Sequence, residues 1–135
     1  PINDTAIKNI LQTAKTIAVV GLSADPDRPS YGVARYMQAQ GYRIIPVNPK
    51  YAEVLGEKSY ARLTDIPFAV DIVDVFRKTA DVLPVAQEAV AIGAKCLWQQ
   101  QGVENLQADA LAQEHGLLSA LDRCIKIEHA RLIGF

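Results

Sequence analysis

The stretch Val19–Tyr36, VVGLSADPDRPSYGVARY, runs from the end of an apolar segment through a glycine into a helix-like pattern. Gly21 suits the tight turn after a strand, because glycine reaches backbone conformations that other residues avoid. Apolar residues recur at spacings of three and four after Ser30, which predicts a helix there. A strand, a glycine turn and a helix open the nucleotide-binding α/β folds, but the second and third glycines of G-x-G-x-x-G are missing here. The loop SADPDRPS supplies a hydroxyl, a guanidinium and prolines in their place.

Five short apolar runs alternate with helix-like patterns along the chain, and we expect each run to be a strand. The runs cover residues 15–22, 42–48, 69–76, 94–100 and 116–121. The helical patterns cover residues 30–41, 79–94 and 105–116, with further helices from Asp4, as the N-cap, to about Lys15 and over residues 121–132. Strands that are apolar on both faces and alternate with helices indicate a parallel sheet covered on both sides. We therefore predict an α/β fold in one domain spanning residues 1–135: a Rossmann-like, doubly wound, open parallel sheet of about five strands in the order 3-2-1-4-5, with helices on both faces.

Composition and charge exclude several classes of protein. Of the 135 residues, 50% are hydrophobic and 21% are charged, which is a globular balance. The net charge of -1 gives no electrostatic reason to expect nucleic acid or an anionic membrane as a partner. No segment has the roughly 18–20 apolar residues of a membrane span, and the N-terminal stretch PINDTAIKNI lacks the apolar core of a signal peptide. We expect a cytoplasmic protein whose two cysteines, Cys96 and Cys124, stay reduced.

The loops at the carboxyl ends of the predicted strands are the expected ligand site, as in other open parallel sheets. In the first of these loops, Ser30 is a candidate N-cap, and its helix would turn free amides near Tyr31 and Gly32 toward an anion. Arg28 has the planar fork that binds a phosphate through two hydrogen bonds. The first loop therefore predicts an anion-binding site.

The second and third loops add positive charge. Enzymes that bind NAD place an acidic residue after the second strand to hold the ribose hydroxyls, whereas this chain has Asn48-Pro49-Lys50 there. A ligand with a phosphate on its ribose suits these residues better. The third strand ends in two more cations on the same edge. The loops together predict a positive rim, partly offset by Asp25 and Asp27, that consists of Arg28, Lys50, Arg77 and Lys78.

Each of these residues also has a purely structural interpretation. Helix capping alone explains Ser30, a turn explains Asn48-Pro49, and ordinary surface charge explains the lysines and arginines. Their common position at one edge of the sheet is what favours a binding function.

Longer stretches of the sequence resemble a known family. Five segments, which follow one another in order over residues 15–132, resemble the small stand-alone CoA-binding protein family. They are VVGLSADPDRPSYGVARY, GYRIIPVNPKYAEVLGEKSYARLTDIP, VDIVDVFRK, GAKCLWQQQGV and DRCIKIEHARL. The implied fold resembles the N-terminal CoA-binding domain of the succinyl-CoA synthetase alpha subunit. One departure is Leu121, where relatives often carry methionine, and that change is conservative.

The resemblance implies CoA or an acyl-CoA as the ligand and assigns residues to its parts. The CoA phosphates would face Gly21, Ser23, Arg28, Pro29 and Ser30. The adenosine part would be flanked by Val47, Asn48, Pro49 and Lys50. The arm would run along Phe76, Arg77, Gln100, Gln101 and Gly102.

The sequence gives little support for catalysis. Cys124 and His129 are five residues apart, about 140° around a helix, and so form no dyad within one helix. Capping explains His115, which precedes a glycine at a predicted helix end. The two histidines and two cysteines lack the spacing of metal ligands, and no metal is predicted.

Three further polar or aromatic residues have structural explanations. Asp71 and Asp74 would point to opposite faces of a strand, which favours structural hydrogen bonds over a paired acid and base. Trp98 is expected in the core rather than stacked on a base.

We therefore expect a CoA- or acyl-CoA-binding module that acts as a carrier, sensor or accessory protein without catalysis. The rival from another class is an NAD(P)-dependent oxidoreductase, which lacks support from G-x-G-x-x-G, from an acid after the second strand and from chain length, although NADP would suit Lys50 and Arg77. A third alternative is an interaction module whose nucleotide site is vestigial.

Overall fold

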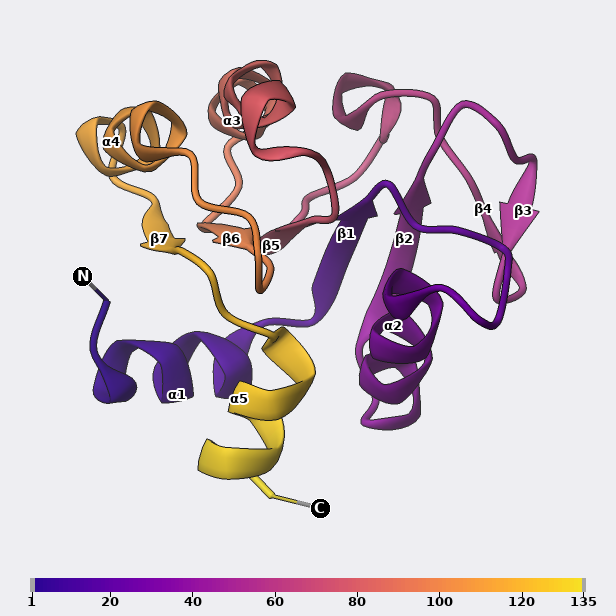
Figure 1. Cartoon of the computed structure of the whole chain (residues 1–135), viewed down its shortest axis with the longest axis horizontal. Coiled ribbons are helices and arrows are strands. Elements are labelled where there is room, and N and C mark those ends of the chain that lie inside the picture. Colours follow the sequence, from indigo (N-terminus) through magenta and orange to yellow (C-terminus); the bar gives the residue numbers. More distant parts are fainter. Residues whose placement is uncertain (1, 135) are drawn as a thin grey trace.

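The computed structural model describes residues 2–134 and contains a five-stranded sheet in the order β2-β1-β5-β6-β7 (Figure 1). The strands of this sheet are β1 (Thr16–Val20), β2 (Arg43–Val47), β5 (Ile72–Val75), β6 (Cys96–Gln99) and β7 (Leu118–Ala120). All neighbouring strands pair in parallel, which confirms the predicted open parallel sheet.

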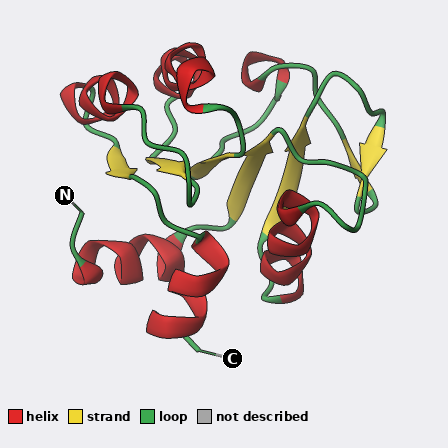
Figure 2. Ribbon diagram, viewed as in Figure 1, coloured by secondary structure: helices red, strands yellow, loops and turns green. Residues whose placement is uncertain are grey.

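Helices cover both faces of this sheet, as predicted (Figure 2). They are α1 (Asp4–Thr13), α2 (Pro29–Ala39), α3 (Val82–Ala91), α4 (Leu106–Glu114) and α5 (Ile125–Leu132), with short 3-10 turns η1 (Leu63–Asp65) and η2 (Thr79–Asp81). One face carries α1, α2 and α5, and the other carries α3 and α4. Side chains of β1 alternate between the layers: Ile17 and Val19 pack on the first face, Ala18 and Val20 on the second. The sheet is thus buried between two cores, as its apolar strands require.

The predicted strand order is wrong at one position. The third strand of the sheet along the chain, β5, lies between β1 and β6 rather than outside β2, so the order is 2-1-3-4-5 instead of 3-2-1-4-5. Pro46 in β2 explains the difference, because proline has no amide to donate and is confined to edge strands. The outer edge of β2 is closed instead by Tyr60, whose amide donates to the Pro46 carbonyl at 3.0 Å and whose carbonyl accepts from the Asn48 amide at 2.8 Å.

The chain between β2 and β5 contains a small hairpin that was not predicted. Its strands, β3 (Glu53–Val54) and β4 (Glu57–Lys58), pair antiparallel around Leu55 and Gly56, which both have a positive φ. Two-residue turns of this kind usually contain Asn-Gly or Asp-Gly. The leucine in the first turn position therefore hides the hairpin from a sequence-based search.

The first helix also begins differently from the prediction. Asn3, not Asp4, is its N-cap, because the Asn3 side chain accepts a hydrogen bond from the Ala6 amide at 2.9 Å. The remaining helices start and end within one or two turns of the predicted segments. None of the helices formed by residues 2–134 combines the length and the apolar character that crossing a bilayer requires.

Candidate functional site at the carboxyl edge of the sheet

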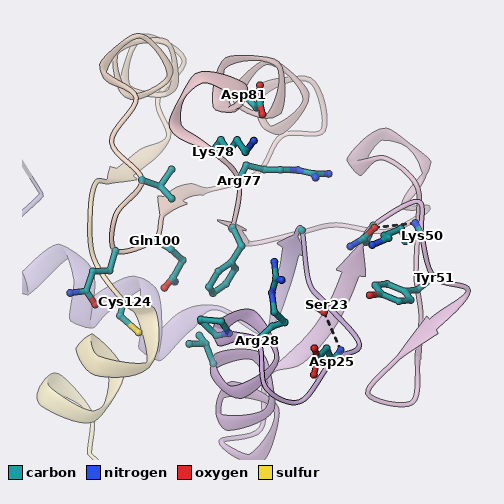
Figure 3. Close-up of a pocket in the computed structure, with 17 residues that line it drawn as sticks. Ser23, Asp25, Arg28, Lys50, Tyr51, Arg77, Lys78, Asp81, Gln100 and Cys124 are labelled. Atoms are coloured by element: carbon teal, nitrogen blue, oxygen red, sulfur yellow. Dashed lines mark hydrogen bonds between the residues drawn. The ribbon is translucent and has the colours of Figure 1, made fainter.

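The carboxyl edge of the sheet opens into a cavity of about 870 Å³ (Figure 3). The loops after β1, β2, β5 and β6 surround it, and Cys124 at the start of α5 contributes to its wall. Open parallel sheets bind ligands at this edge, and the volume is in the range of small-molecule sites. This cavity is therefore the candidate functional site.

Most of the predicted site residues line the cavity. They are Gly21, Ser23, Arg28, Pro29, Asn48, Lys50, Phe76, Arg77, Gln100 and Gln101. Four others lie outside its wall: Ser30 and Val47 are buried, while Pro49 and Gly102 are exposed. The roles assigned to all of these residues toward CoA stay predictions.

Gly21 meets a steric demand between the first and third loops. Its φ is +86°, and its amide donates to the Val47 carbonyl at 2.9 Å. A β-carbon at this position would lie 2.2 Å from the carbonyl oxygen of Phe76. One glycine is thus required by the fold itself, whether or not a phosphate approaches it.

Ser30 does not cap α2, contrary to the prediction. The helix begins at Pro29 after Arg28, so Ser30 is already inside the first turn and past the capping position. Its Oγ accepts a hydrogen bond from the Ser23 amide at 3.0 Å. The Tyr31 amide is not free either, since it donates to the Arg28 carbonyl at 3.1 Å. The loop, rather than the helix end, is what the serine stabilises.

Further hydrogen bonds fix the loops of the cavity wall. Ser23 Oγ accepts from the Asp25 amide at 3.0 Å, and Asp25 Oδ1 accepts from the Asp27 amide at 2.9 Å. Asn48 connects the first and second loops, because its Nδ2 donates to the Leu22 carbonyl at 3.1 Å. The Asn48 Oδ1 also accepts from the amide two residues later, at 3.0 Å. The side chain of Asn48 therefore holds the wall in shape.

Four basic side chains surround the opening of the cavity, as Figure 3 shows. They are Arg28, Lys50, Arg77 and Lys78, all exposed. Within residues 2–134 none of the four forms an ion pair, whereas Lys95 pairs with Asp71 at 3.3 Å and Arg62 with Glu88 at 3.7 Å. Cations without carboxylate partners at one opening favour an anionic ligand, although Asp25 and Asp81 also line the cavity.

Tyr51 lines the cavity beside Lys50 and was not predicted as a site residue. Two hydrogen bonds lower the pKa of the Tyr51 phenol: the one from the Ser23 side chain has the larger effect, and the one from the backbone of Ala24 adds to it. The aromatic ring adds a flat surface where the second loop meets the first. Its position two residues after Pro49, in a loop already singled out, is the signal that would have found it.

A buried carboxyl group lies behind one of the residues that line the cavity. Asp74 is 1% exposed, and its Oδ1 accepts a hydrogen bond of 2.6 Å from Nε2 of Gln100, which lines the cavity. Burial raises the pKa of Asp74 to about 7, although the bond from Gln100 acts in the opposite direction. Trp98 is fully buried beside this strand and donates to the Arg123 carbonyl at 2.8 Å, which confirms its place in the core.

Asp71 has the structural role that its sequence position predicts. Its Oδ2 accepts hydrogen bonds from the amides of Lys15 and Thr16 at 2.8 and 3.1 Å. Burial alone would raise the pKa of Asp71, but these two amides and Lys95 outweigh it and lower that pKa. The carboxylate thus fastens the start of β1 to the start of β5.

Cys124 and His129 have different surroundings. Cys124 is half-buried in the cavity wall, whereas His129 is buried away from that wall and its Nδ1 lies 3.0 Å from the Tyr36 hydroxyl. Burial lowers the pKa of His129. His115 ends α4 as predicted, with its Nδ1 3.1 Å from the Leu111 carbonyl. Among residues 2–134, no three side chains of His, Cys, Asp or Glu converge as a metal site would require.

Comparisons with known proteins cover most of the chain. The uncharacterized protein YneT of Bacillus subtilis is 47% identical over 124 residues, which make up 92% of each protein. A solved structure, described as a hypothetical protein from Pyrococcus horikoshii, is 41% identical and superimposes with a TM-score of 0.95, covering 98% of this chain and 94% of that one.

Part of the chain is similar to a segment of a larger enzyme. The ADP-forming acetate–CoA ligase of Methanocaldococcus jannaschii is 27% identical over 81 residues, which are 60% of this chain and 12% of the ligase.

A family model described as the CoA binding domain matches residues 15–130. The chain therefore belongs to the CoA-binding domain family.

Proposed function

We propose that the chain binds CoA or an acyl-CoA in the cavity at the carboxyl edge of the sheet and acts as a binding module without catalysis. The observation that carries this proposal is the convergence of four cations, none of them in an ion pair within residues 2–134, from three loops on one opening. CoA has a diphosphate and a ribose 3′-phosphate, so it carries anionic groups at two separate points. A site for it needs cations that are spread along a groove rather than gathered at one spot.

The positions of the cations match that requirement. Lys50 lies at one end of the cavity next to Tyr51, whereas Arg77 and Lys78 lie across the opening from Arg28 (Figure 3). The ribose phosphate would lie near Lys50, and the diphosphate would lie between Arg28 and the third loop. Arginine suits the diphosphate because its fork donates two hydrogen bonds.

The remaining wall suits an uncharged arm. Phe76 and Val103 contribute apolar surface, and Gln100 and Gln101 contribute amides. The pantetheine arm of CoA combines methylene groups with two secondary amides, so both kinds of wall are useful to it. The proposed arm site leads toward Cys124.

Among the described residues, the cavity wall provides no complete catalytic apparatus. A cysteine nucleophile needs a base within hydrogen-bond reach, and His129 is turned to Tyr36 instead. Asp74 is a titratable group but lies beneath the cavity, beyond the residues that line it. The proposal is therefore a carrier, sensor or accessory protein.

Calorimetric titration with CoA, dephospho-CoA, NAD and NADP at one fixed salt concentration tests the proposal. We expect CoA to bind and dephospho-CoA to bind more weakly, because the latter lacks the phosphate that Lys50 would contact. If the protein binds NADP but not CoA, the site is that of an NADP-dependent oxidoreductase instead. Absence of binding to all four would favour a vestigial site that serves protein interaction.

A further inference from the structure

Asp74 is a buried carboxyl group at the centre of the sheet. It belongs to β5, lies in register with Val19 of β1 and Trp98 of β6, and is 1% exposed. Within the described residues 2–134 it has no ion pair, and its side chain is held by the 2.6 Å bond from Gln100 Nε2. Burying a carboxyl group without a neighbouring cation lowers the stability of the folded protein. A group kept at this cost is a candidate for a functional role.

Gln100 connects this group with the cavity. It follows β6 directly, is 3% exposed and lines the cavity, and its backbone amide donates to the Val75 carbonyl at 3.3 Å. A glutamine amide has a donor end and an acceptor end. Because Nε2 is turned to Asp74, the carbonyl oxygen of Gln100 is the end left for the cavity.

We propose that Asp74 is a positioning residue, which holds the Gln100 amide so that its carbonyl oxygen faces the cavity and accepts a hydrogen bond from a secondary amide N–H of the bound ligand. This inference rests on the proposed function, because CoA has such amides in its pantetheine arm. It adds a device that selects for an amide-bearing arm. Adenine nucleotides without that arm gain nothing from it.

The orientation depends on the protonation state of Asp74. A carboxylate only accepts hydrogen bonds, so it fixes Nε2 toward itself. A protonated Asp74 can donate to the Gln100 carbonyl, which lets the amide rotate and turn its NH2 group to the cavity. Since burial raises the pKa of Asp74 to about 7, the two orientations would exchange near neutral pH.

Other titratable groups lie on the same face of the sheet. Cys96 on β6 is fully buried, and burial together with the charge of Asp74 raises its pKa, so it stays a neutral thiol. The covering helices contribute Cys124, at the start of α5, and His129, whose partner is Tyr36 on α2. Among these titratable groups, Asp74 is the carboxyl group, and it accepts a hydrogen bond directly from Gln100.

Titration of CoA into the wild type and the variants Asp74→Asn, Gln100→Met and their double variant, at pH 8, tests the inference. An asparagine side chain both donates and accepts, so Asp74→Asn no longer restricts the Gln100 amide to one orientation. We expect this variant to bind CoA about tenfold more weakly, as loss of one hydrogen bond does. Gln100→Met should weaken binding by a similar factor. The double variant should be no weaker than Gln100→Met, because Asp74 acts through Gln100.

A second ligand provides the control. Adenosine 3′,5′-diphosphate has the phosphates at the adenosine end and no pantetheine arm, so its affinity should be the same for all four proteins. The titration of the CoA 3′-phosphate affects the wild type and Asp74→Asn alike, so comparing the two proteins with CoA itself corrects for it. Between pH 8 and pH 6, the wild-type affinity for CoA should fall further than that of Asp74→Asn.

The two proposals can fail separately. If the wild type binds no CoA, the proposed function is wrong, and the Gln100 side-chain amide signal in NMR spectra of the ligand-free protein still tests the positioning. That signal should shift across a transition near pH 7 in the wild type and stay constant in Asp74→Asn. CoA affinity unaffected by Asp74→Asn, or a Gln100 signal that does not titrate, would overturn the inference.

Discussion

A β-carbon placed on Gly21 would lie 2.2 Å from the carbonyl oxygen of Phe76, closer than any side chain can approach a backbone atom without moving it. The φ of +86° at Gly21 adds a second penalty, because L-residues disfavour that region by roughly 1–2 kcal/mol. We expect Gly21→Ala to lower the free energy of unfolding by more than about 2 kcal/mol, measured by urea denaturation.

Gly32 in α2 is the matched control for that substitution. A β-carbon there meets nothing within 4 Å, and the residue is helical. Gly32→Ala should therefore raise the free energy of unfolding by about 0.5–1 kcal/mol, because alanine is the better helix former. A Gly21→Ala protein as stable as the wild type would show that the first and third loops do not approach as described.

Asp74 should make the protein less stable as the pH rises. Its pKa is about 7 in the folded protein against an ordinary value of 3.8, so between these values the folded chain keeps a proton that the unfolded chain has lost. Stability from this group is therefore complete below about pH 4 and is lost by up to about 1.4 kcal/mol per pH unit until about pH 7. The check is the difference in unfolding free energy between wild type and Asp74→Asn at several pH values, which cancels the titration of other groups.

Arg28 should contribute to CoA affinity through its charge and fork. We expect Arg28→Ala to weaken CoA binding by one to two orders of magnitude, because a charge-assisted hydrogen bond is worth about 1.5–3 kcal/mol. Arg35→Ala is the control, since Arg35 is exposed on the helix that follows Arg28 but does not line the cavity. Equal affinities of the two variants in calorimetry would remove Arg28 from the phosphate site.

The two thiols should react very differently with iodoacetamide. Cys96 is fully buried and burial raises its pKa, whereas Cys124 is half-buried in the cavity wall. Mass spectrometry of the native protein should find the label on Cys124, and CoA should slow that labelling in proportion to the occupied fraction. Labelling that is indifferent to saturating CoA would separate Cys124 from the arm site.

The fold was largely predictable because each strand is apolar on both faces and each is followed by a recognisable turn or helix. The predicted order of the strands was wrong, although Pro46 could have corrected it. Proline has no backbone N–H to donate to a neighbouring strand, which indicates that β2 is an edge strand. The β3–β4 hairpin was hidden because Leu55 occupies a turn position with positive φ.

The candidate site was predictable at the level of loops and less so at the level of single atoms. Alternation of strands and helices places Arg28, Lys50 and Arg77 at one edge without any knowledge of side-chain contacts. The bond from the Ser23 amide to Ser30 depends on where the helix starts to within one residue, which sequence patterns do not resolve. The Asp74–Gln100 bond joins β5 to the residue that follows β6, so predicting it requires the register of the sheet.

The loop between β1 and α2 has a consequence for how fast a ligand can bind. Three hydrogen bonds link residues 23–30 to one another, and we expect them to hold the loop in the same shape with and without a ligand. Ordering a mobile backbone costs roughly 1–2 kcal/mol per residue, and this chain meets that cost during folding rather than during binding. Ligand contacts are then free to appear as affinity, and the association rate should be governed by diffusion and charge attraction, with no slow loop-closing phase.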